Sequence, residues 1–217
     1  MNSLEFAADL FFPKQNSNFS SVHTYLTDSE ITGEQSHFKI LDNDQKVFLE
    51  SVFIASHLNN KLVSDLIHRA KIGLEYAILM DLARLLLSKA TEQDSIPDPD
   101  LIIYVPFDPK RFLSRGYHLP KIISTYLAES FNVESHSLVY KSKSTPQQTM
   151  LNRSERLSNL KNKFKLIEPL EINLSKYHNI WLVDDVTTTG TTLYEVAKVI
   201  KTEFPFLKIY GLVVASN

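Results

Sequence analysis

Two adjacent carboxylates followed by a run of hydroxyl side chains are the part of this sequence whose residue types are best suited to chemistry. Asp184 and Asp185 come directly after an apolar run at residues 180–183, and a threonine-rich turn around Gly190 follows them. Carboxylates accept hydrogen bonds from hydroxyl groups, and short hydroxyl side chains donate hydrogen bonds to anions. The pattern therefore predicts a site for a ligand that carries hydroxyl groups at one end and an anion at the other.

The elements that must position these residues are a strand, a turn and a helix. The apolar run predicts a strand buried on both faces of a parallel sheet, with the two aspartates at its carboxyl end, where open α/β sheets bind ligands. Apolar residues at helical spacing in the segment 193–202 predict a helix directly after the turn. The backbone N–H groups of the turn then lie at the positive end of the helix dipole, which favours a phosphate.

The ligand predicted from these features is a ribose with a phosphate on its fifth carbon, because paired carboxylates repel a bare phosphate but suit vicinal hydroxyl groups. Gly190 lets the main chain approach the phosphate closely. The residues expected to hold the phosphate are Thr187, Thr188, Thr189, Gly190, Thr191 and Thr192. The plainer alternative, an ordinary acidic and threonine-rich turn, leaves the double aspartate without explanation. A Walker-type loop and a GxGxxG fingerprint are absent from the sequence.

The composition excludes several functional classes. The chain has 217 residues, of which 43% are hydrophobic and none is cysteine, so disulfides, thiolate metal sites and a cysteine nucleophile are excluded. A net charge of −2 gives no global attraction to nucleic acid or to an anionic membrane. No apolar run approaches the roughly 18 residues of a membrane span, and residues 1–10 lack the basic region of a signal peptide. We therefore expect a cytoplasmic α/β protein.

The chain is expected to consist of a small N-terminal appendage, residues 1–45, and one α/β domain, residues 46–217. The appendage is predicted to hold a short amphipathic helix at 1–12 and a polar loop at 13–37. Further elements are predicted in the domain: strands at 47–55, 101–105, 137–140 and 207–214, helices at 59–69, 75–89 and 119–131, and a linker at 91–100.

A basic cluster follows the strand predicted at 101–105. Lys110, Arg111 and Arg115 come after Pro106 and next to a turn glycine. One interpretation of these charges is a solvated turn. A second phosphate-binding loop is favoured, because the cluster follows a neighbouring strand end and a diphosphate needs several positive donors.

The segment 141–164 is basic and contains few large apolar residues, so we do not expect it to pack in the core. We predict a flexible hood that closes over a polyanion and excludes water during reaction, with Lys143 among its charged residues. The alternative for this segment is a plain solvated loop followed by a helix.

Several segments resemble a known family. The segment around Asp184 is similar to the phosphoribosyl-diphosphate (PRPP) signature of type I phosphoribosyltransferases, which has two acids, three further residues and then Thr-Gly-x-Thr. The segment 106–117 resembles the basic loop of the ComF-like phosphoribosyltransferases, the competence and gluconate-utilisation type. The segment 145–160 resembles their Thr-Pro-x-Gln motif with its spaced arginines, and residues 66–71 match their Leu-Ile-x-x-x-Lys helix end more weakly. The resemblance extends from about residue 45 to the C-terminus.

This resemblance implies a type I phosphoribosyltransferase fold, a parallel sheet flanked by helices with a flexible hood, that binds PRPP with Mg²⁺. Asp184 and Asp185 would hold the ribose hydroxyls and would contact the metal indirectly, through those hydroxyls or water. The residues implied for the diphosphate side are Pro106, Lys110, Arg111, Arg115 and Lys143. The implied transition state resembles an oxocarbenium ion, so its stabilisation would be electrostatic and positional.

The chain departs from the family pattern in two places. Family members usually carry a four-cysteine zinc ribbon after an N-terminal Phe-Pro, and here Phe12-Pro13 is present without any cysteine. The basic loop continues as Tyr117-His118-Leu119, where the family usually has an aromatic residue, Asn and Gln. The contacts to the acceptor or diphosphate are therefore open, and we assign His118 no catalytic role.

Two functions stay open. One is phosphoribosyl transfer, for which Thr188 indicates an amine, ammonia or an already acidic acceptor, because threonine cannot take a proton from a purine as an acidic residue there would. The other is a catalytically silent module of a DNA-uptake system that binds PRPP, a nucleotide or DNA, with DNA or a competence protein as partner. No membrane partner is expected, and the oligomeric state, a dimer or otherwise, is left open.

Overall fold

The computed structural model describes residues 36–38, 47–73, 75–92, 94–107, 117–142 and 163–216, and of 36–38 it describes the backbone. Some predictions lie outside these residues. They are the helix at 1–12, most of the polar loop at 13–37, the basic residues Lys110, Arg111 and Arg115, and the hood from Lys143 to residue 162.

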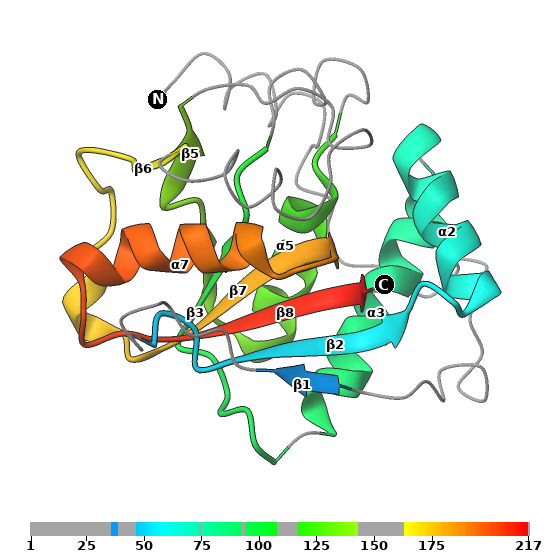
Figure 1. Cartoon of the computed structure of the whole chain (residues 1–217), viewed down its shortest axis with the longest axis horizontal. Coiled ribbons are helices and arrows are strands. Elements are labelled where there is room, and N and C mark those ends of the chain that lie inside the picture. Colours follow the sequence, from blue (N-terminus) through cyan, green and yellow to red (C-terminus); the bar gives the residue numbers. More distant parts are fainter. Residues whose placement is uncertain are drawn as a thin grey trace.

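Among the described residues, the centre of the fold is a six-stranded sheet in the order β1-β2-β8-β7-β3-β4. Figure 1 labels β1, β2, β8, β7 and β3 of this sheet. Its strands are β1 Ser36–Phe38, β2 Ser51–His57, β3 Leu101–Tyr104, β4 Glu134–His136, β7 Asn179–Thr187 and β8 Lys208–Ser216. β1 pairs antiparallel with β2, and the remaining neighbours in this sheet are parallel. A separate antiparallel pair is formed by β5 Val139–Lys141 and β6 Phe164–Leu166. The predicted parallel sheet is therefore confirmed.

Helices cover both faces of this sheet. Their bounds are α2 Lys61–Ile72, α3 Tyr76–Thr91, α5 Leu119–Phe131 and α7 Thr191–Glu203. The first three pack on one face, in a core that includes Trp181 and Val183 of β7. α7 packs on the other face, in a core that includes Ile180 and Leu182. Alternate residues of β7 thus enter two cores, which explains why its apolar run is continuous. The helices predicted at 59–69, 75–89, 119–131 and 193–202 are confirmed.

The short edge strands are where the sequence-based prediction was wrong. The polarity of the sequence predicts a loop through His37, but residues 36–38 form β1 against β2. β4 was not predicted, and β2 begins at Ser51 rather than at residue 47. β1 and β4 read Ser-His-Phe and Glu-Ser-His, so they lack the apolar alternation that identifies a strand. β1 lies within the predicted appendage, whose separation from the domain stays a prediction.

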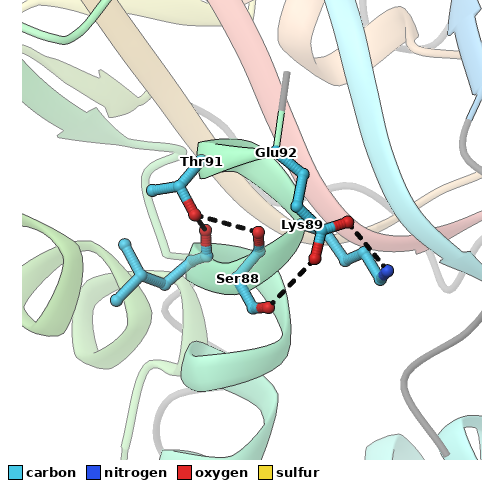
Figure 2. A network of polar contacts seen from close by, with 5 residues as sticks. Ser88, Lys89, Thr91 and Glu92 are labelled. Atoms are coloured by element: carbon cyan, nitrogen blue, oxygen red, sulfur yellow. Dashed lines mark hydrogen bonds and ion pairs between the residues drawn. The ribbon is translucent and has the colours of Figure 1, made fainter. Parts of the chain in front are cut away.

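Polar contacts hold the C-terminal end of α3 (Figure 2). Lys89 Nζ lies 3.0 Å from Glu92 Oε2. The Thr91 hydroxyl donates hydrogen bonds to the carbonyl oxygens of Leu87 and Ser88, at 3.0 and 2.9 Å. A basic side chain in the last turn also interacts favourably with the helix dipole. These contacts stabilise the point at which the chain leaves α3 for the linker.

The described part of the linker fixes the beginning of β7. Asp100 Oδ2 accepts hydrogen bonds from the backbone N–H groups of His178 and Asn179, each at 2.8 Å. The Trp181 indole Nε1 donates a hydrogen bond to the Pro97 carbonyl oxygen at 3.0 Å. These bonds anchor the start of β7, and its pairing with β8 as far as Thr187 holds the other end.

Candidate functional site

β7 carries the acidic pair inside the sheet rather than beyond it. The strand continues through Asp184 and Asp185 to Thr187, with Asp184 opposite Val213 and Thr187 opposite Ser216 of β8. The sequence-based prediction ended the strand at the aspartates, because the apolar run ends there. Pairing with β8 extends the strand, since neighbouring backbone supplies hydrogen bonds whatever the side chains are.

Both carboxyl groups of the pair are held by hydrogen bonds. Asp184 Oδ1 accepts a hydrogen bond from the Asp185 backbone N–H, and Asp185 Oδ1 accepts one from the Val186 N–H, both at 2.8 Å. The second oxygen of Asp185, Oδ2, lies 3.1 Å from Lys71 Nζ in the last turn of α2. The Asp185 carboxylate thus has a partner on each oxygen.

The two carboxyl groups differ in their protonation. Burial, and next the charge of the neighbouring Asp185, raise the pKa of Asp184 well above its usual value. Burial also acts to raise the pKa of Asp185, but the Lys71 ammonium and the hydrogen bonds to Asp185 outweigh it, so that this pKa is lowered. Asp185 is therefore the ionised member of the pair, and Asp184 keeps a proton to higher pH.

The turn after β7 has a left-handed glycine at the start of α7. Gly190 has φ 69° and ψ 0°, a conformation that favours glycine, and it occupies the N-cap position of the helix. Its N–H donates a hydrogen bond to Thr187 Oγ1 at 2.9 Å. The hydroxyl oxygens of Thr189 and Thr191 lie 2.7 Å apart. The turn is thus closed by its own side chains.

The N–H groups on either side of Gly190 remain available. Those of Thr188, Thr189, Thr191 and Thr192 donate to no other described residue. The first N–H groups of any helix lack intrahelical partners. A phosphate at this turn would therefore meet the neighbours of Gly190 rather than the Gly190 N–H, which Thr187 occupies. This refines the prediction, which treated the six turn residues alike.

The end of β3 lies beside the acidic pair. The Val105 N–H donates a hydrogen bond to the Val183 carbonyl oxygen at 2.9 Å, so the buried Pro106 follows next to β7. The Tyr117 hydroxyl donates a hydrogen bond to the Gly73 carbonyl oxygen at 3.3 Å. That contact joins a residue just before the start of α5 to the residue after the end of α2. The start of α5 and the end of α2 are therefore held close together.

His118 is a neutral group near this edge. Its ring makes edge-to-face contacts with Tyr104 and Phe107, with centroid distances of 5.6 and 6.1 Å. Burial lowers the pKa of His118 to about 4, although the Asp185 charge acts to raise it. Its Nδ1 atom is buried and forms no hydrogen bond with a described residue. The ring therefore stays uncharged at neutral pH, and the structure assigns it no catalytic contact.

The structure brings the described members of the predicted site to one edge of the sheet: Asp184, Asp185, Thr187, Thr188, Thr189, Gly190, Thr191, Thr192 and Pro106. Lys110, Arg111, Arg115 and Lys143 lie outside the described residues. Lys71 belongs to the site but was not among the predicted site residues. Its sequence signal was the weak similarity of residues 66–71 to the family's helix end.

The described residues hold no group of three or more His, Cys, Asp or Glu side chains that could bind a metal ion.

None of the described helices is long and apolar enough to cross a membrane.

Comparison with solved structures finds phosphoribosyltransferases of low similarity to this chain. Helicobacter pylori xanthine-guanine-hypoxanthine phosphoribosyltransferase has a TM-score of 0.42 and 13% identity, covering 65% of this chain and 73% of that one. Orotate phosphoribosyltransferase from Aeropyrum pernix has a TM-score of 0.37 and 12% identity, covering 82% of this chain and 73% of that one. These likenesses are weak, and they concern the fold alone.

No protein-family model matches the chain, but individual proteins do. DNA utilization protein YhgH of Escherichia coli K12 and of Salmonella typhi is 32% identical over 142 residues, which are 64% of this chain and 60% of YhgH. The match therefore spans less than two thirds of YhgH. Competence protein F of Haemophilus influenzae is 34% identical over 157 residues, which are 69% of this chain and 67% of that protein. With that identity over that length, the chain belongs to the competence protein F family.

Proposed function

We propose that the chain binds the ribose 5-phosphate part of PRPP at the end of β7 and transfers the phosphoribosyl group to an acceptor. One observation carries this proposal. An ionised carboxylate, Asp185, lies on the same continuous strand, turn and helix as four N–H groups that donate to no other described residue, those of Thr188, Thr189, Thr191 and Thr192. The hydroxyl end and the phosphate end of a ribose 5-phosphate need these two features side by side.

The acidic pair would bind the ribose hydroxyl groups. The Asp185 carboxylate accepts hydrogen bonds, and those made to a charged acceptor are stronger than neutral ones. Asp184, whose pKa is raised by burial, can donate a hydrogen bond when protonated. One anionic acceptor beside one group that both donates and accepts suits two vicinal hydroxyls, and it places less negative charge near the phosphate than two ionised carboxylates would.

The turn would bind the 5′-phosphate. α7 has 13 residues, so its peptide dipoles give a partial positive charge at the turn. Thr188 is exposed, and its N–H donates to no other described residue. The N–H groups of Thr189, Thr191 and Thr192 would complete the cradle.

Mg²⁺ fits this site as a partner of the substrate. Carboxylate oxygens are donors that it accepts, and the ion is commonly held by one or two carboxylates together with phosphates and water. Asp184 and Asp185 would hold it indirectly, through the ribose hydroxyls or water. When bound, the ion would neutralise charge on the diphosphate.

Transfer would break the bond between the first ribose carbon and the diphosphate and would join that carbon to the acceptor. The residues proposed to stabilise the leaving diphosphate, all outside the described segments, are Lys110, Arg111, Arg115 and Lys143. Thr188 offers no side-chain base beside the turn, so an amine, ammonia or an already acidic acceptor is favoured over a purine.

A second candidate function is a catalytically silent module of a DNA-uptake system that binds PRPP, a nucleotide or DNA. The matched proteins are named for competence and for DNA utilization. Under this alternative the site would bind its ligand without releasing diphosphate. The basic segments would then contact DNA or a competence protein.

Release of diphosphate from labelled PRPP separates the two functions. The assay contains Mg²⁺ and a panel of amine, ammonia and acidic acceptors. Release that requires an acceptor and is lost in Asp185→Asn supports transfer. Calorimetric binding of PRPP without release, together with DNA binding that weakens as salt rises, supports the module. If no pentose phosphate binds, the proposal is wrong.

A further inference from the structure

The last turn of α2 carries two basic residues whose partners differ. Arg69 pairs with Glu75, just after the helix, with an N–O distance of 2.6 Å. Lys71 pairs instead with Asp185 of β7, at 3.1 Å. The side chain of Glu75 is 43% exposed and that of Asp185 is 17% exposed, so Lys71 has the more shielded partner. The ion pair of Lys71 therefore connects α2 to the proposed ligand site.

The position of Lys71 is fixed by the packing of its helix. The Asn60 side chain accepts hydrogen bonds from the first turn of α2. The Gly73 carbonyl oxygen, just beyond α2, accepts the hydrogen bond from Tyr117. Between these ends, four residues of the helix are buried in the core: Val63, Leu66, Ile67 and Ala70. Because α2 is held at both ends and buried along one face, the position of Lys71 next to Asp185 is fixed by the fold.

Asp185 lies on the face of the sheet that α2 covers. Side chains alternate along a strand, so Asp185 shares the face of Trp181 and Val183, whose core includes α2. Asp184 shares the opposite face with Leu182, whose core includes α7. The alternation along β7 therefore places the side chain of Asp185, and not that of Asp184, on the face that α2 covers.

We propose that Lys71 is a positioning residue of the ribose 5-phosphate site: its ammonium fixes the Asp185 carboxylate for the ribose hydroxyls and offsets its charge beside the phosphate-binding turn. This inference rests on the proposed function and adds to it a residue from a distant part of the chain. Without a cation here, the carboxylate would repel the phosphate of the ligand. A role in stability alone explains the pair less well, because partly exposed ion pairs contribute little to stability.

The test compares ribose 5-phosphate with 2-deoxyribose 5-phosphate, which keeps the phosphate but lacks one hydroxyl. Titration calorimetry gives both affinities for the wild type and for Lys71→Met, Lys71→Arg and Arg69→Met. Lys71→Met is expected to weaken ribose 5-phosphate about tenfold and to reduce the preference for ribose, because a charged acceptor loses its orientation. Lys71→Arg should restore most of the affinity. Arg69→Met, the matched control from the same turn, should leave both affinities unchanged.

A double-mutant cycle shows whether Lys71 acts through Asp185. In an Asp185→Asn background, Lys71→Met should add little further loss. With wild-type binding intact, the inference is overturned if Lys71→Met keeps the ribose preference, or if it costs the same in both backgrounds. If the wild type binds neither sugar phosphate, the proposed function fails and the inference fails with it. Thermal unfolding checks that each variant is folded, and Lys71→Gln replaces Lys71→Met if that variant is not.

Discussion

The N-terminal end of α7 and the C-terminal end of α2 both lie near the end of β7 that carries the acidic pair, but they come from different parts of the chain. α7 follows the acidic pair directly, so its turn can be identified from contiguous sequence. α2 is far from the pair in sequence, and Lys71 contacts Asp185 because the helix packs on the face that Asp185 shares. Local spacing therefore predicts the turn proposed to bind the phosphate, whereas the cation beside the carboxylate proposed to bind the hydroxyls depends on the fold.

The two helix ends also differ in electrostatics. The start of α7 carries a partial positive charge, which favours an anion, and the end of α2 carries a partial negative charge, which favours a cation. Asp185 lies near the negative end, where a carboxylate alone would be unfavourable. Lys71 in the last turn of α2 satisfies both the helix end and the carboxylate. The contributions of the two helices to binding should therefore be separable by mutation.

Asp185→Asn should have the largest effect on ligand binding, because the Asp185 carboxylate contacts Lys71 of α2 and also lies on the strand that leads into the turn before α7. We expect the affinity for ribose 5-phosphate to fall about a hundredfold, since a charged acceptor is lost and Lys71 keeps no partner there. Titration calorimetry measures the loss. Asp184→Asn is the matched control and should cost less, because Asp184 is the member whose pKa is raised. Equal losses would contradict the inequivalence of the two carboxyl groups.

His118→Asn should alter the pH dependence of stability, and so test whether the start of α5 holds a neutral ring near Asp185. The folded pKa of His118 is about 4, below the value of about 6.5 in an unfolded chain. Between these values the unfolded state binds a proton that the folded state does not, so stability falls as the pH falls. At pH 5 this costs the wild type about 2 kcal/mol, which the variant should not lose.

Urea unfolding of both proteins at pH 7.5 and pH 5 measures this difference. The groups whose charges act on His118 are Asp185, which raises its pKa, and Lys121, which lowers it. A Lys121→Met variant is the control and should change the pH dependence less, since burial is the larger cause. An equal loss of stability with pH in wild type and His118→Asn would mean that the ring is not held neutral.

Much of the fold and part of the site could be predicted from the sequence. The buried run before Asp184 and the helical spacing after Gly190 are strong local patterns, and β7 and α7 formed where they indicated. The edge strands β1 and β4 could not be predicted, because their polar residues pair only once the sheet exists. Lys71 was missed for a related reason: a single lysine at a helix end has no partner until the topology brings Asp185 to it.

Gly190→Ala tests the α7 side alone. Alanine is disfavoured at φ 69°, so we expect a loss of about 1–2 kcal/mol in the free energy of unfolding and weaker binding of inorganic phosphate. The preference for ribose over 2-deoxyribose 5-phosphate should persist, because the acidic pair is unchanged. Gly73→Ala is the matched control, since Gly73 has φ −130° and room for a Cβ atom. Loss of the ribose preference in Gly190→Ala would mean that the two sides do not act separately.

Asn60→Ala tests the α2 side at the end of the helix away from the site, and it should have the smallest effect on binding. Loss of the cap should cost about 1 kcal/mol of stability, because two N–H groups in the first turn lose their acceptor. The rest of α2 stays buried in the core, so Lys71 should keep its contact and ribose 5-phosphate its affinity. Urea unfolding and calorimetry measure the two effects, with Asn60→Ser as a control that retains a capping oxygen. If Asn60→Ala reduced the ribose preference as much as Lys71→Met does, the placement of the whole helix, rather than the charge at its end, would set the affinity.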